Sequence, residues 1–120
     1  MQKFFVPGRL PDFNSMIAAA KRRHCGWNAY HLLKQEWDAI IRYEIKQAKI
    51  RPMSRLRLCC RWQEANKRRD PDGLIVAKKF ILDALVQSKI IPNDGWSEIA
   101  GFTDEFVVNP KQPGVWVTLI

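Results

Sequence analysis

Residues 54–62 read Ser-Arg-Leu-Arg-Leu-Cys-Cys-Arg-Trp, and apolar and basic side chains alternate along most of this stretch. Successive side chains on a β-strand point to opposite faces, so the alternation predicts a strand with one buried and one exposed face. The buried face would carry Leu56, Leu58, Cys60 and Trp62, and the exposed face would carry Arg55, Arg57, Cys59 and Arg61. Such a strand belongs in a sheet that is covered on one side only.

The chain before this strand contains signals for one short strand and two helical segments. Residues 3–6 are largely apolar and are followed by a Pro-Gly pair, which predicts a first strand. A short helical piece should follow and end in the basic run 21–24, before a break at Gly26. From about 27 to 47 apolar residues recur at helical spacing, which predicts a helix that lies on the core and stops before Pro52.

The chain after this strand contains signals for one apolar helix and two further strands. Residues 74–88 are strongly apolar and predict the helix, and the Pro-Asn-Asp-Gly sequence at 92–95 marks a loop. Residues 99–108 and 115–120 predict two final strands joined by a turn that contains proline and glycine.

Without the short helical piece, the order is β-α-β-α-β-β, which predicts an α+β fold in which helices pack on a single mixed sheet. The length of 120 residues and the hydrophobic share of 47% fit one domain spanning residues 1–120. No apolar run approaches the roughly 18 residues of a membrane span, and the apolar part of the N-terminus is too short for a signal peptide. Three cysteines, Cys25, Cys59 and Cys60, lack zinc-ligand spacing and fit a reducing compartment. We therefore expect a soluble intracellular protein.

Charge is distributed unevenly along the sequence. Residues 1–69 hold 16 Lys+Arg and 5 Asp+Glu, whereas residues 70–120 hold 4 and 7, and the whole chain carries +8. Excess positive charge suggests a polyanionic partner, nucleic acid first of all, although a solvated charged surface is the alternative. The densest basic patch consists of Arg55, Arg57, Arg61, Lys67, Arg68 and Arg69.

Three aspartates form the candidate site. If Asp70 and Asp72 lie in an extended segment, their carboxylates face the same side, and Pro71 favours such a segment. With Asp94 they would offer hard oxygen ligands, which suit Mg²⁺ or Mn²⁺ better than zinc. The alternative is local: Asp72 is well placed to cap the helix at 74–88, and Asp94 before a glycine is common in turns.

Two further residues could serve this site. Lys79 can share a helix stripe with Asp72, from which it could hold a phosphate, but an i,i+4 ion pair with Asp83 is the simpler reading. Trp96, beside the 92–95 loop, is the tryptophan best placed to touch DNA, while the other four fit core positions.

Three motifs in order resemble the RusA family of Holliday-junction resolvases, especially its phage-borne members. They are Lys-Arg-Arg-Asp-Pro-Asp-Gly at 67–73, Ala-Lys-Lys-Phe-Ile-Leu-Asp-Ala-Leu at 77–85 and Ile-Pro-Asn-Asp-Gly-Trp at 91–96. The N-terminal Val-Pro-Gly-Arg-Leu-Pro-Asp-Phe-Asn at 6–14 also looks like the opening of the phage sequences. The resemblance is strongest over 67–99.

The resemblance implies a Mg²⁺-dependent crossover junction endodeoxyribonuclease, with Mn²⁺ as substitute, that acts as a homodimer. It would nick opposed strands of a four-way DNA junction with metal-activated water, in phage recombination and DNA repair. It implies neither a membrane partner nor a small-molecule cofactor, and it suggests the cytoplasm of a bacterial host, with a prophage gene as one source. The implied catalytic residues are Asp70, Asp72, Asp94 and Lys79, and the three aspartates among them would bind the metal. Lys78 takes the place of Lys79 if the alignment with the family is shifted by one residue. Otherwise Lys78 is a DNA-binding residue, like those of the basic patch.

Two positions depart from the family pattern. Gly73 stands where the family usually has asparagine, and Asn93 stands where a second acid is often found. Two alternatives remain open beside the nuclease. One is a non-catalytic basic DNA-binding module of phage recombination or replication, and the other is a phage regulatory or assembly protein that binds an acidic protein.

Overall fold

The computed structural model describes residues 1–24 and 27–120, and its centre is a four-stranded mixed sheet. The strands are β1 (Gln2–Pro7), β4 (Leu56–Glu64), β5 (Ile99–Val108) and β6 (Gly114–Leu119), in the spatial order β1-β6-β4-β5. β6 runs antiparallel to both β1 and β4, whereas β4 and β5 are parallel. The predicted α+β fold with a mixed sheet is thereby confirmed.

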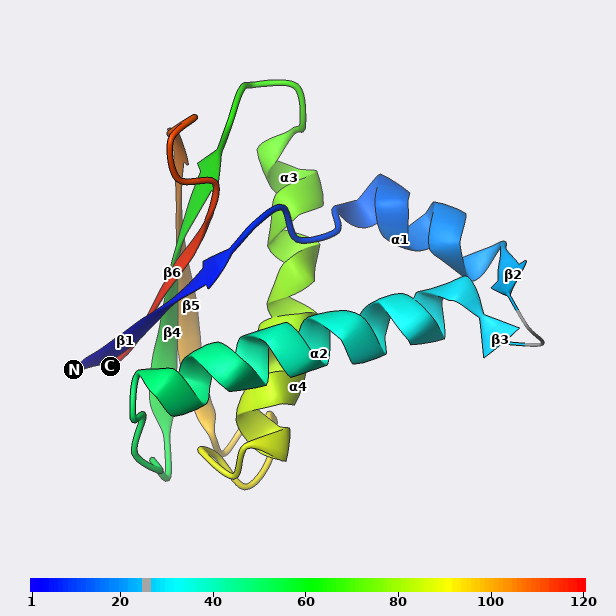
Figure 1. The fold of residues 1–120 in the computed structure, drawn as a ribbon. Helices are drawn as coiled ribbons and strands as arrows, with labels where there is room; N and C mark the ends of the chain where they lie inside the picture. Colours follow the sequence, from blue (N-terminus) through cyan, green and yellow to red (C-terminus); the bar gives the residue numbers. More distant parts are fainter. Residues whose placement is uncertain (25–26) are drawn as a thin grey trace.

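The helices lie on one side of this sheet (Figure 1). Helix α2 (Ala29–Gln47) crosses helix α4 (Lys78–Gln87), and α4 continues a short helix α3 (Pro71–Leu74) and a 3₁₀ turn (Ile75–Ala77). No described helix covers the other face of the sheet. In the part of the chain that the structure describes, none of the helices is both long and apolar enough to cross a membrane.

The alternation in β4 determines which face is covered. Leu56, Leu58, Cys60 and Trp62 are all at most 3% exposed and join the core, whereas Arg57 and Arg61 are exposed. The strand is shifted two residues from the predicted range, since it begins at Leu56 and continues to Glu64. The core that these side chains enter includes Phe4, Val6, Ile41, Ile45, Phe80, Ile81, Leu85, Val115, Val117 and Leu119.

A segment that the sequence did not predict in detail extends away from the sheet (Figure 1). Helix α1 (Phe13–Ala20) begins where the Asp12 carboxylate accepts a hydrogen bond from the Ser15 amide, at 2.9 Å. A two-stranded hairpin of β2 (Arg23–His24) and β3 (Trp27–Asn28) then leads into α2. The break expected at Gly26 and the thiol of Cys25 lie outside the described residues.

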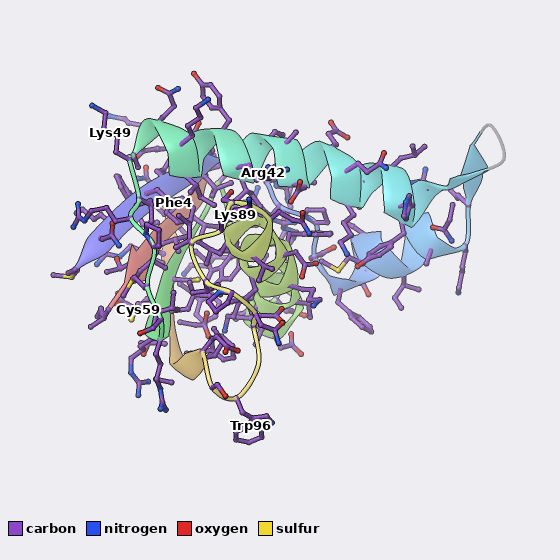
Figure 2. All side chains as sticks on the ribbon, turned by 90° about the horizontal axis from the view of Figure 1, so that it is seen from below. Phe4, Arg42, Lys49, Cys59, Lys89 and Trp96 are labelled. Atoms are coloured by element: carbon purple, nitrogen blue, oxygen red, sulfur yellow. The ribbon has the colours of Figure 1, made fainter. Side chains whose placement is uncertain are left out.

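Helices α2 and α4 end in the same way. After each helix a lysine adopts a positive φ, 54° at Lys49 and 60° at Lys89 (both labelled in Figure 2). The next residue, Ile50 or Ile90, then donates its amide to a carbonyl in the last helical turn. This is the left-handed termination that glycine usually provides, and it directs each isoleucine back toward the core.

The start of α3 corrects one expectation. Pro71 occupies the first helical turn, Asp70 is the residue before the helix with φ −78° and ψ 144°, and Asp72 is already helical. The extended 70–72 segment and the capping role of Asp72 for a helix starting at 74 are therefore wrong. The physical reason is that the fixed φ of proline suits the first position of a helix as well as it suits an extended chain.

Candidate functional site

Arg69 fixes the chain immediately before the candidate site. Its guanidinium donates Nε to Oε1 and Nη2 to Oε2 of Glu64, at 2.8 and 2.7 Å, and donates Nη1 to the Leu10 carbonyl at 2.7 Å. Both charged side chains are about 14% exposed or less. Arg69 therefore joins the end of β4 to the loop after β1 and is not available as the DNA-binding residue expected from the sequence.

Asp70 and Asp72 share one surface hollow of about 530 Å³. It lies between the start of α1 and the start of α3, and it is lined by Asp12, Phe13, Asn14, Arg68, Arg69, Asp70, Asp72, Gly73 and Val76. The first turn of α3 carries Asp72, and the Arg69 contacts hold the backbone at Asp70. The structure thus brings these two predicted site residues together.

Among the described residues, Asp70 and Asp72 are the only aspartates whose side chains have no hydrogen-bond or ion-pair partner. All seven aspartates lie in the described part of the chain. Five of them bind a cation or an amide: Asp12, Asp38, Asp83, Asp94 and Asp104. In a protein with a net charge of +8, two exposed neighbouring carboxylates without a counter-ion are available to an external cation.

Gly73 lies at the edge of the same hollow. A Cβ built on it would lie 3.9 Å from the Asp12 Cβ and from the Phe13 amide nitrogen, which is ordinary van der Waals contact. Glycine is therefore not required here for steric reasons, and an asparagine at this position would fit.

Asp94 lies in a different hollow, of about 470 Å³, between α2 and α4. The Lys79 ammonium contacts Asp94 at 3.4 Å and Asp83 at 3.1 Å, and Lys34 contacts Asp83 at 3.1 Å. The hydrogen bond with Asp83 is the main cause that raises the pKa of Lys79; partial burial opposes it and the charge of Asp94 adds to it. The hollow is lined by His31, Lys34, Gln35, Asp38, Lys79, Asp83, Val86, Gln87, Asn93 and Asp94.

The expected convergence of three aspartates is not present. Within residues 1–24 and 27–120, no three Asp, Glu, His or Cys side chains gather as metal ligands would. Lys79 does not extend back to Asp72, which lies seven positions earlier, roughly 10 Å along a helix. It forms the i,i+4 ion pair with Asp83 that was the simpler reading, and the same ammonium reaches Asp94.

Lys78 points to the other side of α4. Its ammonium lies 2.7 Å from Oδ2 of Asp104 and 4.3 Å from the ring centroid of Phe102, and Trp62 donates to Oδ1 of Asp104 at 2.9 Å. With 12% of its side chain exposed, Lys78 joins α4 to β5 and cannot reach DNA without breaking this network. Nothing in the sequence indicates the ion pair between Lys78 and Asp104, because Asp104 is 26 positions away.

The remaining basic residues are exposed but do not form one cradle. Arg57 and Arg61 lie on the uncovered face of the sheet, opposite the helices that carry Asp72 and Lys79. Arg55 is exposed just before β4, and Lys67 and Arg68 are exposed in the loop that leads to Asp70. Trp96 is 98% exposed and projects from its loop (Figure 2).

Comparison with known proteins adds no identification. No protein-family model matches the sequence, and no curated protein matches it significantly. The motif order at 67–96 therefore remains the basis for the family resemblance.

Proposed function

We propose that this chain is a Mg²⁺-dependent endodeoxyribonuclease that cuts four-way DNA junctions in the cytoplasm of a bacterial host, with Asp70 and Asp72 as its metal-binding carboxylates. The observation that carries the proposal is that these two aspartates share a hollow and have no described counter-ion, whereas the other five aspartates have partners. The resemblance at 67–73 supplies the reaction class.

The donor set fits the metal. Mg²⁺ commonly uses only one or two carboxylates and completes its coordination shell with water and substrate phosphate oxygens. Asp70 and Asp72 therefore suffice as protein ligands, and Asp94 is not needed beside them. When bound, the ion would supply a water nucleophile and offset the charge that develops on the scissile phosphate.

The residues around the pair would orient the substrate. Arg69 keeps the backbone at Asp70 in place through Glu64 and Leu10. Lys67 and Arg68 are exposed beside the hollow and can contact phosphates without reading sequence. The catalytic roles of Lys79 and Asp94 stay predictions, and they would act on the DNA from the second hollow.

A homodimer would present two such sites to a junction with two-fold symmetry. The free edge of β5 is a candidate surface for it, because no described strand pairs with the outer side of these ten residues. Phe106, Val107 and Val108 are each about 40% exposed or more there. They line an apolar hollow together with Asp70 and Pro71, so a partner at this edge would lie close to the metal pair.

Incubation of the purified protein with junction, duplex and single-stranded DNA, with Mg²⁺ or with a chelator, tests the proposal. We expect paired nicks in the junction with Mg²⁺ only, none with Asp72→Asn, and normal nicking with Glu36→Gln. Glu36 is an exposed acid on α2 that likewise has no described partner, so it controls for the loss of one charge. A wild-type protein that binds junctions and never cuts them in Mg²⁺ or Mn²⁺ would refute the nuclease.

The separation of Asp94 from Asp70 and Asp72 favours a second candidate, a non-catalytic DNA-binding module. In that case binding would be unaffected by a chelator and would fall steeply with salt, because phosphate contacts release counter-ions. The same gel and a salt titration separate the two candidates.

A further inference from the structure

The uncovered face of the sheet presents two ordered rows of side chains. The strand register places Lys3, Thr118, Cys59 and Thr103 side by side across the four strands. The next row on the same face consists of Phe5, Trp116, Arg61 and Glu105. The side chains of the first row are mostly small, and this row forms a low floor. The second row carries two aromatic rings and an arginine, and it forms a higher rim beside the floor.

A shallow hollow of about 360 Å³ lies over the first row. Small side chains, Cys59, Thr103 and Thr118, line it together with Cys60 and four larger residues, Lys3, Arg61, Glu105 and Trp116. Most of the floor can donate or accept hydrogen bonds through its hydroxyl groups. The hollow is bordered by an aromatic ring, two cations and one carboxylate, that of Glu105, so its border carries a net positive charge. Such a hollow suits a flat polar ring attached to an anion.

The aromatic part of the rim is fixed by its neighbours. The rings of Phe5 and Trp116 have centroids 5.0 Å apart, and the Lys3 ammonium lies 5.2 Å from the Trp116 centroid. Gly114 has no side chain, and any Cβ there would collide with the Phe5 ring. The pair therefore holds Trp116 at the border of the hollow without further ordering on binding.

The charge on this face is positive. Arg57 lies across Gly101, where a Cβ would come within 2.5 Å of its Nη1 atom, and it has no ion pair with any described residue. Arg61 lies 3.5 Å from Glu105, but both side chains are more than half exposed, so the pair is weak and screened by salt. Lys3, Arg57 and Arg61 thus outnumber Glu105 on one flat surface.

We infer that this face binds an unpaired DNA strand, with a base against Trp116 and phosphates against Lys3, Arg57 and Arg61. An aromatic ring on a sheet can stack only on a base that is not inside a duplex, and stacking with a basic groove is a common mode of single-strand binding. The site is on the face opposite the Asp70–Asp72 hollow. It goes beyond the proposed nuclease and does not depend on metal, so the two can fail separately.

Fluorescence anisotropy with a labelled oligothymidylate of about eight nucleotides, in the presence of a chelator, tests the inference. We expect Trp116→Leu and Arg61→Gln each to weaken binding by about ten-fold. The matched controls, Tyr43→Leu and Lys46→Gln, remove an exposed aromatic ring and an exposed lysine on α2 and should bind as the wild type does. Equal affinity of Arg61→Gln and wild type, or equally strong competition by a blunt duplex, would overturn the inference.

Alkylation of Cys59 gives a second readout that does not require a variant of the proposed site. Burial is the main cause that raises the pKa of the Cys60 thiol to about 12, so this thiol stays protonated and unreactive. In a Cys25→Ser protein, a water-soluble alkylating reagent therefore reports on Cys59. The oligonucleotide should slow alkylation of Cys59 several-fold, and Asp72→Asn should leave this protection unchanged. An unchanged rate at saturating oligonucleotide would contradict the inference, as would protection that depends on protein concentration alone, since a second copy would then cover the face.

Discussion

Two hollows on the helix side of the molecule carry aspartates, and they differ in what those aspartates contact. In the hollow between α2 and α4, Asp83 and Asp94 are paired with Lys34 and Lys79. In the hollow between α1 and α3, Asp70 and Asp72 contact no described cation.

The difference suggests that the aspartates of the first hollow already have counter-ions, whereas Asp70 and Asp72 do not. A carboxylate with a lysine 3.1 Å away already has its counter-charge, whereas Asp70 and Asp72 form no ion pair with Arg68 and Arg69, the two arginines that line the same hollow. The family resemblance treats Asp70, Asp72 and Asp94 alike, and the geometry separates them into two carboxylates without a described counter-ion and one ion-paired residue.

The largest expected effect comes from exchanging one aspartate in each hollow. Asp70→Asn should lower junction cleavage by about 10³-fold and leave stability unchanged. The variant would lose several kcal/mol of charge stabilisation in the transition state, and about 1.4 kcal/mol corresponds to a ten-fold change in rate. Asp83→Asn should instead lower stability, because Lys34 and Lys79 lose their partner, while cleavage is retained. Single-turnover cleavage and urea unfolding measure the two quantities. The comparison fails if Asp83→Asn is the inactive variant.

Arg69→Ala should lower the free energy of unfolding by about 2–3 kcal/mol, because Glu64 and the Leu10 carbonyl lose charged hydrogen bonds in a mostly buried place. Urea denaturation measures the change. Arg68→Ala is the matched control and should stay within about 0.5 kcal/mol of wild type, because its side chain is exposed. Equal losses in the two variants would show that the Arg69 contacts add no more stability than an exposed side chain does.

Lys79→Met tests whether the second hollow contributes beyond structure. We expect a stability loss of less than about 1 kcal/mol, since the Lys79 side chain is 58% exposed. Because the folded pKa of Lys79 is raised, its contribution is complete below 10.5, the ordinary lysine value, and is lost as pH rises through the folded pKa. Unfolding of wild type and variant should therefore converge at alkaline pH. A cleavage loss of about 10²-fold or more would support the predicted catalytic role, since positioned groups commonly contribute 10²–10⁴-fold. Unchanged cleavage would assign Lys79 to the fold alone.

The smallest expected effects concern the two lysines in left-handed conformation. Lys49→Gly and Lys89→Gly should each stabilise the protein by about 0.5–1 kcal/mol, because glycine adopts this conformation without strain. Lys46→Gly, inside the last turn of α2, should destabilise it by about 1 kcal/mol. Thermal unfolding of the three variants checks the signs, and a destabilised Lys89→Gly would contradict this account of the helix end.

Much of the fold could be predicted because the relevant signals are local. The alternation from Leu56 to Trp62 identifies the buried face of β4, and the turn with Pro110 and Pro113 separates β5 from β6. Pro71 misled the prediction because proline is compatible with both an extended segment and a helix start. Nothing local distinguishes those two outcomes.

The candidate site was less predictable because its geometry depends on contacts between distant residues. Lys78 and Lys79 are adjacent, yet one pairs with Asp104 on β5 and the other with Asp83 and Asp94. Their directions follow from the rotation of about 100° per residue around a helix, but their partners follow from how α4 packs on the sheet. The position of Trp116 on the uncovered face likewise required the strand order, which places β6 between β1 and β4.

Paramagnetic broadening of backbone amide resonances by Mn²⁺ tests the central claim most directly. We expect sub-stoichiometric Mn²⁺ to broaden the signals of residues 70–73 and of residues 12–14 across the hollow, and Mg²⁺ to compete with it. Asp72→Asn should abolish the effect, and Asp83→Asn should preserve it. Broadening centred on residues 83 and 94, or none at all, would contradict the assignment of Asp70 and Asp72 as the metal-binding pair.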